Sequence, residues 1–449
     1  MQRALTIFVG SVLSGSLLTL ALPPGNHWWV GWFALVPVLW TVRGRGFLWG
    51  FFGGLVSLFS MAFFADLGLF YTNRSFGGEP AWLFTGCGLF GFSVSVLSGS
   101  WADKNSNKKP LWWFAAFAVL LEALLLLQLP AHLALSQYRH PMMLFFASIG
   151  GIWMVSFLVW YVNLLIADFA TNPTLRHGVL TSIAILAVLG GNYSWKLFQT
   201  ETDESQVFGV LQTAESDAEV LKKLHGKLAA LGASLVVWPE FAGLVLAPSG
   251  KTEELMAIAA DSRASIVTTY NDDLAPFPHN VAALINASGT SDLYFKRKLF
   301  GGESKMHTPG DRAVQAGQVG LNICFDTCYP HIIRQTALLP GVTVIALPTI
   351  DPETPHQFIA AMHAAFTPFR AAENGVTIAR ADGFAHSMIV GADGKIRFEL
   401  ASGEGMGASA ISFPTETLYK RLGDWFLYLC GLGFAVGLIC FRTNRLARL

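Results

Sequence analysis

LVVWPEFAG, residues 235–243, runs four apolar residues straight into Pro239 and Glu240. A short apolar run that ends at a proline is typical of a buried strand. A carboxylate at the end of a buried strand costs free energy unless other groups pair with it. Glu240 therefore requires partners from elsewhere in the chain.

Helical and strand patterns alternate on both sides of this stretch, from about residue 205 to 415. Leu221, Leu224 and Leu228 share one face of a predicted helix that precedes the strand ASLVVWPE. Three further units follow. In the first, the helix EELMAIAADS precedes the strand ASIVTTYND. In the second, the strand VGLNICFD is followed by a helix and the strand VTVIALPT, and in the third the helix FIAAMHAAFTPFRAAENG precedes the strand VTIARADG. Hairpins are expected around residues 288–290 and at 393–394. The alternation predicts an α/β fold in which helices cover the sheets.

Three chemically useful side chains follow predicted strands: Glu240, Lys296 in YFKRK and Cys324 in ICFD. A thiol with an ordinary pKa is mostly protonated at neutral pH, so a nucleophilic cysteine needs a base or a nearby cation. Glu240 would take the proton and Lys296 would stabilise the thiolate and the following oxyanion. The residues leave simpler alternatives open, namely a plain buried ion pair between Glu240 and Lys296 and a packing role for Cys324.

Two neighbours compete for these roles. Lys298 is the rival of Lys296, and Cys328 is the rival of Cys324 one helical turn later. A disulfide between Cys324 and Cys328 is a further alternative, although residues one helical turn apart make a poor bridge. The remaining three cysteines lie in apolar runs and are expected to pack as small core residues: Cys87, Cys430 and Cys440.

The motifs WPE, YFKRK followed by GGE, and ICFD, in this order, resemble the Glu-Lys-Cys motifs of the nitrilase superfamily of carbon-nitrogen hydrolases. The resemblance implies an αββα sandwich in which Glu240 is the general base, Lys296 stabilises the oxyanion and Cys324 is the nucleophile. Glu303 of GGE matches the second active-site glutamate, and Phe325 and Asp326 follow the cysteine as supporting residues. Glu373 and Asn374 match a further signature that is structural.

The first 200 residues have a different composition. They hold only 15 of the 60 charged residues. Apolar segments long enough to cross a bilayer, which takes about 20 residues, occur at 4–22, 27–42, 46–71, 81–101, 110–130, 143–168, 176–194 and 424–441. We expect a seven-span transmembrane domain at 1–200, a catalytic domain at 201–418, and an eighth span with a basic tail at 419–449.

Lys and Arg residues in the short loops predict the orientation. With a cytoplasmic N-terminus, the cytoplasmic side holds ten of them and the opposite side two: Arg3, Arg43, Arg45, Lys104, Lys108, Lys109, Arg176, Arg442, Arg445 and Arg448, against Arg74 and Arg139. We therefore expect a multi-pass protein of the bacterial inner membrane, with both termini cytoplasmic and the catalytic domain periplasmic.

The membrane segments extend the resemblance to the membrane-embedded branch of the superfamily, the apolipoprotein N-acyltransferases. LALPPGNHWWVGWFALVPVLW and the segment LSQYRHPMMLFFASIGGIWMVSFLVWYVNLLIA, with Asn163 near its end, follow that family's pattern. The resemblance implies two-step acyl transfer from a glycerophospholipid such as phosphatidylethanolamine, through a Cys324 thioester, to the N-terminal amine of a diacylglyceryl-cysteine in an apolipoprotein. The implied partners are the phospholipid donor, the diacylated lipoprotein acceptor and the bilayer, and a monomer is expected.

Some features of the sequence depart from the family pattern. Cys324-Phe325-Asp326 replaces the family's Cys-Tyr-Glu, and PTIDPE at 348–353 replaces an Asn-Asp with aromatics. A membrane amidase or acyltransferase for a different amine or amide, and a catalytically silent scaffold, remain as alternatives.

The formal net charge is zero, and the sequence has no basic stripe, phosphate loop or zinc-ligand spacing. Neither nucleic acid nor any cofactor or metal is therefore expected. Five histidines are expected in surface or core roles: His307, His331, His356, His363 and His386.

Overall fold

The chain forms two compact units, each of which is described by itself. The computed structural model describes residues 2–65, 88, 90–98, 110–125, 132–169, 178, 201–214, 217–245, 252–272, 277–353 and 357–446. The first unit comprises residues 1–73, 79–197 and 424–449, and the second comprises 74–78 and 198–423.

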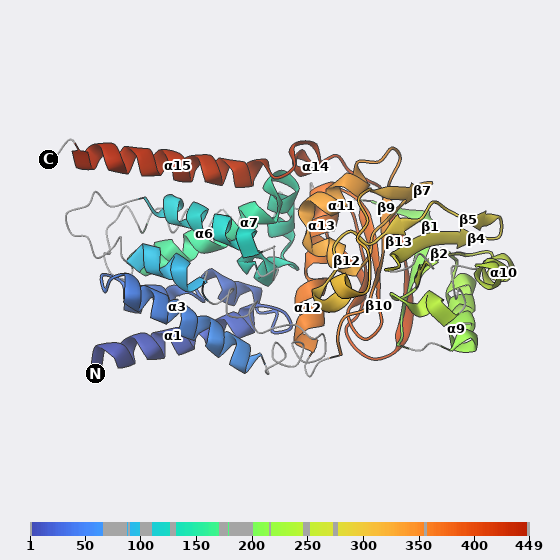
Figure 1. The fold of residues 1–449 in the computed structure, drawn as a ribbon, viewed down its shortest axis with the longest axis horizontal. Helices are drawn as coiled ribbons and strands as arrows, with labels where there is room; N and C mark the ends of the chain where they lie inside the picture. Colours follow the sequence, from blue (N-terminus) through green and yellow to red (C-terminus); the bar gives the residue numbers. More distant parts are fainter. Residues whose placement is uncertain are drawn as a thin grey trace. The chain divides into compact units, whose positions relative to one another are not determined.

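The first unit is helical (Figure 1). Its helices are α1 (Gln2–Ala21), α2 (Val36–Val42), α3 (Phe47–Phe64), α6 (Leu111–Leu125), α7 (Pro141–Phe169) and α15 (Trp425–Leu446), with short 3-10 turns at Trp28–Trp32 and Leu133–Gln137. Helices α1 and α3 approach closely because Gly15 has no side chain, and a Cβ there would lie 2.4 Å from the carbonyl oxygen of Ser57. Helices α6 and α15 meet where the Trp113 indole donates to the carbonyl oxygen of Phe434 at 3.1 Å and the two rings stack.

Three of the described helices are long and apolar enough to cross a membrane: α1, α3 and α7. The predicted span at 27–42 contains only a 3-10 turn and the seven-residue α2, because the chain breaks its helix between them. The predicted span at 176–194 lies outside the described residues except for position 178, and that at 81–101 is described only in part. Asn163 is buried in α7 and bonds the backbone of Gly31 and Leu35.

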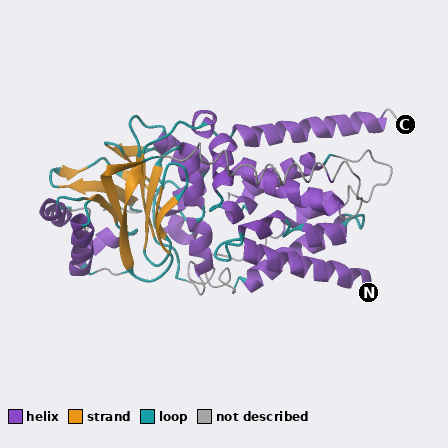
Figure 2. Cartoon of the chain, turned by 180° about the vertical axis from the view of Figure 1, so that it is seen from behind, coloured by secondary structure: helices purple, strands orange, loops and turns teal. Residues whose placement is uncertain are grey.

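The second unit contains two mixed sheets (Figure 2). The first has the order β13-β1-β2-β3-β4-β5, with β6 also paired to β4: β1 (Thr202–Gln212), β2 (Ala233–Val237), β3 (Ser265–Asn271), β4 (Asn280–Asn286), β5 (Gly289–Thr290), β6 (Tyr294–Phe295) and β13 (Gly405–Ser412). The second has the order β12-β11-β10-β9-β8-β7: β7 (Val314–Ala316), β8 (Val319–Leu321), β9 (Val344–Thr349), β10 (Thr377–Asp382), β11 (Ser387–Val390) and β12 (Ile396–Leu400). Strands β1, β2 and β3 run parallel, as do β8, β9 and β10.

Helices cover both sheets. α9 (Ala218–Ala230) and α10 (Glu253–Ser262) pack on the first, and α11 (Pro330–Ala337), α12 (Phe358–Ala364) and α13 (Phe366–Asn374) lie with the second, while α14 (Leu418–Leu422) packs on α13. Helix α9 begins at Asp217, whose carboxylate accepts the backbone N–H of Glu219 at 2.8 Å. Leu221 and Leu228 bury its apolar face, with Leu224 partly buried beside them, against a core that includes Val236 and Trp238.

The predicted α/β fold, with helices covering the sheets, and both hairpins are therefore confirmed. The predicted single helix after β9 is instead the pair α12 and α13, separated at Ala365. Strands β1 and β13, which pair with each other, were not expected from the sequence. The two sheets contact each other through β1 and β10, so the ends of β2, β8 and β9 bring their following loops to one region.

Candidate active site

Glu240 has the partners that its burial requires. It follows β2 by three residues, and its backbone N–H donates to the carbonyl oxygen of Thr349 at the end of β9. The side chain is fully buried, and its carboxylate accepts three hydrogen bonds: from Lys296 Nζ at 2.9 Å, from Asn280 Nδ2 at 2.7 Å and from the backbone N–H of Ile350 at 3.1 Å. The charge at the end of the buried strand is therefore compensated by a cation and two neutral donors.

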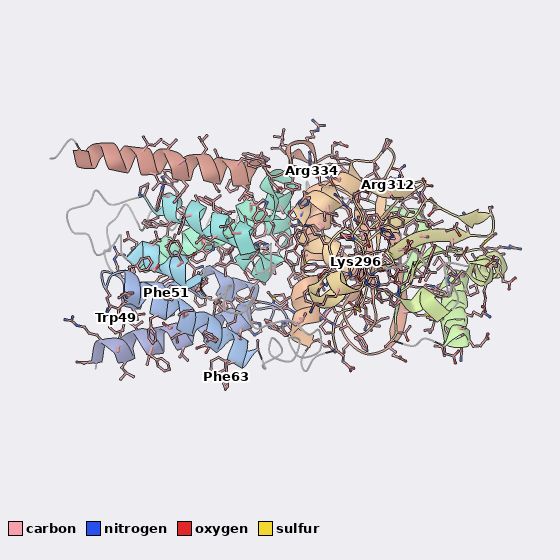
Figure 3. All side chains as sticks on the ribbon, viewed as in Figure 1. Trp49, Phe51, Phe63, Lys296, Arg312 and Arg334 are labelled. Atoms are coloured by element: carbon pink, nitrogen blue, oxygen red, sulfur yellow. The ribbon has the colours of Figure 1, made fainter. Side chains whose placement is uncertain are left out.

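Lys296 lies between two carboxylates. It directly follows β6, and its backbone N–H donates to the carbonyl oxygen of Asn280. Its ammonium is fully buried and donates to Glu240 and to Glu303 Oε1, the latter at 2.8 Å. The other oxygen of Glu303 accepts the backbone N–H of Phe300, which fixes that carboxylate in place. Figure 3 labels Lys296 in the side-chain-filled interior of the second unit.

Cys324 begins a 3-10 turn, Cys324–Cys328, that follows β8. Its backbone has φ = 46°, in the left-handed region that costs a residue with a Cβ free energy. Its carbonyl oxygen accepts the Thr327 hydroxyl at 2.7 Å and lies 3.2 Å from Nε2 of His363. The residue is 6% exposed, so a strained backbone presents a nearly buried thiol.

The charges of these groups act on one another. Burial raises the pKa of Glu240 against the lowering effect of Lys296, so the carboxylate is a stronger base than an exposed one. Burial alone would lower the pKa of Lys296, but the charges of Cys324, Glu240 and Glu303 raise it well above its usual value. Burial, followed by the Glu240 charge, raises the pKa of Cys324, while Lys296 opposes both. The resting site thus holds a protonated thiol beside a base and a permanent cation.

Asp326 joins the cysteine turn to the lysine segment. Its carboxylate accepts the Tyr294 hydroxyl at 2.6 Å and the backbone N–H groups of Lys298 and Ile323 at 2.9 and 3.0 Å. Phe325 packs edge-on against Phe300, with ring centroids 5.0 Å apart. Both supporting residues therefore position the loops that carry Lys296 and Cys324.

The rival residues occupy other places. The ammonium of Lys298 lies 4.7 Å from the centre of the Tyr329 ring and is not between the carboxylates. Cys324 and Cys328 are both free thiols, so the disulfide alternative is excluded for this structure. Glu373 is buried and paired with Arg370 at 3.0 Å in α13, and Asn374 donates to the carbonyl oxygen of Arg370.

Three residues near the site were not predicted to belong to it: Asn280, Asp351, and His363, for which only a surface or core role was expected. Asp351 is buried and binds both the His363 ring and Arg380, which also binds Asp382. One atom each of Cys324, Asp351 and His363 lies within 4.8 Å of the others, a set whose chemistry suits a zinc ion. Asp351 is, however, already bonded by the His363 ring and by the Arg380 guanidinium, and these bonds account for the group without an ion.

Comparisons with known proteins cover both units. Residues 14–165 match the family model of the apolipoprotein N-acyltransferase N-terminal domain, and residues 191–421, more than half of the chain, match that of the carbon-nitrogen hydrolases. The apolipoprotein N-acyltransferase of Thermosynechococcus vestitus is 23% identical over 94% of this chain and 93% of its own, and that of Geobacter metallireducens 24% over 97% and 96%. An amidase crystal structure from Nesterenkonia sp. matches with a TM-score of 0.41 and 20% identity, covering 51% of this chain and 97% of the amidase.

Proposed function

The chain belongs to the carbon-nitrogen hydrolase family and is an acyltransferase, and we propose that Cys324 carries an acyl chain from a glycerophospholipid to the N-terminal amine of diacylglyceryl-cysteine in apolipoproteins. The observation that carries this proposal is the buried Glu240–Lys296–Glu303 cluster beside Cys324, in a chain similar to apolipoprotein N-acyltransferases over almost its whole length.

The first half-reaction makes a thioester. The Cys324 sulfur attacks the carbonyl carbon of the donor's sn-1 ester while Glu240 accepts the thiol proton. Lys296 stabilises the negative charge that forms on the carbonyl oxygen. When the ester C–O bond breaks, Glu240 gives its proton to the leaving oxygen, and the lysophospholipid departs.

The second half-reaction transfers the acyl chain. The free amine of the acceptor attacks the thioester carbonyl, and an amide bond forms as the C–S bond breaks. One amine proton passes to Glu240 and from there to the leaving Cys324 sulfur, so the enzyme returns to its starting state. The donor ester, the thioester and the product amide have the same oxidation level, so neither an oxidant nor a reductant is required. In each half-reaction one bond to the acyl carbon forms and one breaks.

The substrate class follows from the first unit. Helices α1, α3 and α7 suit a protein of the bacterial inner membrane, where the phospholipid donor and a diacylated acceptor are anchored. The proposal includes eight spans, a catalytic unit outside the cytoplasm and cytoplasmic termini. These arrangements rest on the lengths of the apolar segments and on the distribution of Lys and Arg.

The decisive experiment follows the intact mass of the purified chain. We expect wild type incubated with phosphatidylethanolamine to gain the mass of one acyl chain, and Cys324→Ala to gain none. Adding a diacylated lipopeptide should discharge the acyl chain onto the lipopeptide amine, with Cys328→Ala behaving as wild type. Discharge only to water or to unrelated amines would instead favour a membrane amidase, and no mass gain in any condition would contradict the thioester mechanism.

A further inference from the structure

His363 connects the nucleophile to a second charged network. It lies in α12, and its ring is nearly buried. Nδ1 lies 2.8 and 3.0 Å from the two carboxylate oxygens of Asp351, and Nε2 lies 3.2 Å from the carbonyl oxygen of Cys324. Both ring nitrogens therefore face oxygen acceptors.

The hydrogen-bond geometry of the ring favours an imidazolium. A neutral imidazole has one N–H and could satisfy only one of the two oxygens, whereas an imidazolium donates to both. Asp351 is an ionised acceptor: burial alone would raise its pKa, but the charges of His363 and Arg380 lower it to about 2. Arg380 Nη2 also holds Asp351 at 2.5 Å, so the carboxylate stays turned to the ring.

The position of the ring matters for the thiol. After burial and Glu240, the Asp351 charge is a further cause that raises the pKa of Cys324. A cation bonded to Asp351 and within 4.8 Å of the sulfur offsets that charge. The hydrogen bond to the Cys324 carbonyl oxygen also restrains the left-handed backbone of this residue.

We infer that His363 is a positioning residue for the nucleophile: as an imidazolium it holds the backbone of Cys324 and screens its thiol from Asp351. The inference deepens the proposed function, since it rests on Cys324 as the nucleophile. It assigns a role to a histidine outside the Glu-Lys-Cys set.

The His363 ring bonds Asp351, which Arg380 also binds, and Arg380 binds Asp382. Further charged residues lie in the cysteine turn and in helix α13, both of which contact α12: Asp326, Arg370 and Glu373. Burial, with the Asp351 charge, raises the pKa of Asp382 to about 7, so this group titrates near neutral pH. An Asp382→Asn variant removes this titration from the network.

The test measures the reactivity of Cys324 in the full-length chain, without lipid substrates. Alkylation by neutral iodoacetamide and by anionic iodoacetate is followed from pH 6 to 9, and modified Cys324 is quantified by peptide mass. The variants are His363→Gln, which retains an N–H for the Cys324 carbonyl oxygen, and His363→Asn, which reaches only Asp351. The matched control is His386→Asn, another nearly buried histidine, paired with Glu399 at 3.2 Å. Its positive φ of 58° is one that asparagine tolerates.

We expect iodoacetamide to react with His363→Asn on the order of ten- to a hundredfold more slowly than with wild type. The decrease in rate should be smaller for His363→Gln. The ratio of iodoacetate to iodoacetamide rates should fall about fourfold in both, because a cation near the sulfur attracts the anionic reagent. Asp382→Asn should give the same ratio as wild type, because Asp382 is not bonded to the His363 ring. His386→Asn should match wild type.

An unchanged ratio in His363→Gln, or an equal change in His386→Asn, would overturn the inference. Thermal unfolding of each variant identifies a loss of folding, and two variants at position 363 keep the test decisive. Alkylation needs neither donor nor acceptor. A shifted ratio without acyl transfer in wild type would therefore reject the proposed function and retain the role of His363.

Discussion

Lys296 is the residue on which the charge balance of the site depends. Its ammonium is the only cation within salt-bridge distance of Glu240 and Glu303 among the residues that the structure describes. Lys296 and Glu240 are fully buried and Glu303 is partly buried, and both carboxylates lose their compensation if the lysine is removed. A buried ion pair broken on one side costs far more than an exposed one.

Replacing Lys296 with Met should therefore destabilise the chain by about 3 to 5 kcal/mol and abolish acyl-enzyme formation. Lys298→Met is the matched control in the same segment, because its ammonium lies over Tyr329 rather than between carboxylates. It should cost about 1 kcal/mol or less and keep activity. Thermal unfolding and intact mass measure both effects. A control as damaging as Lys296→Met would contradict the assignment of Lys296.

At the scale of elements, the parallel pairing of β9 with β10 assembles the charged network behind Cys324. Thr349 is paired with Asp382, so the ends of both strands lie side by side. Asp351 lies just after the end of β9, and Arg380 and Asp382 lie two residues apart at the end of β10. One guanidinium therefore serves two buried carboxylates, and one of these carboxylates binds a proton readily.

This arrangement makes stability depend on pH. Burial and the charge of Asp351 raise the pKa of Asp382 to about 7, from an ordinary value of 3.8. Between pH 4 and 7 the folded chain holds a proton at Asp382 that the unfolded chain has released. The free energy of unfolding contributed by this group is thus highest at low pH and falls as pH rises, by at most about 1.4 kcal/mol per pH unit.

Wild type should therefore gain stability relative to Asp382→Asn as pH falls from 6.5 to 4.5. Thermal or urea unfolding of the two chains at several pH values measures this difference. Parallel pH profiles would rule out a protonated Asp382. The opposite sign applies to Asp351, whose lowered pKa of about 2 means that its contribution is lost only in strong acid.

The sequence predicts those parts of the site that lie directly after strands. Glu240, Lys296 and Cys324 lie in short motifs at strand ends. There the local sequence pattern predicts both the strand and the reactive side chain that follows it. Asp351 and His363 gave no such signal, because their contact depends on the path of the chain from β9 into α12. Nothing in the spacing of His363 indicates that Cys324, 39 residues earlier, contacts its ring.

Long-range pairing explains the missed strands. The first half of β1 is polar and contains a register shift between Asp203 and Val207, so it lacks the alternation expected of a strand. Strand β13 is rich in glycine, alanine and serine, residues with little intrinsic preference for strands. Their pairing to each other, across almost the entire second unit, is what makes them strands.

At the scale of the whole molecule, the second unit is inserted within the sequence of the first. The chain enters it near residue 198 and leaves it near 423, to return in α15. If α15 crosses the membrane, both ends of the insertion lie on one side of it. The proposed orientation places that side outside the cytoplasm.

Single-cysteine labelling can test this topology. A membrane-impermeant maleimide should label Asp311→Cys, an exposed position in the second unit, in spheroplasts with intact inner membranes. It should label Gln2→Cys only after the membrane is permeabilised. Both substitutions are made in a chain whose native cysteines are replaced. Labelling of Gln2→Cys but not Asp311→Cys in intact spheroplasts would reverse the orientation.

The contact between α6 and α15 has a consequence for biosynthesis. The indole of Trp113 is 1% exposed and donates to the carbonyl oxygen of Phe434, which the ribosome adds 434 − 113 = 321 residues later. At roughly 5 to 20 residues per second, synthesis of the intervening residues takes roughly 15 to 65 s, and Phe434 does not exist during that time. During that interval the indole lacks both its stacking partner and its acceptor on α15. The last helix thus completes a unit whose other helices were made long before.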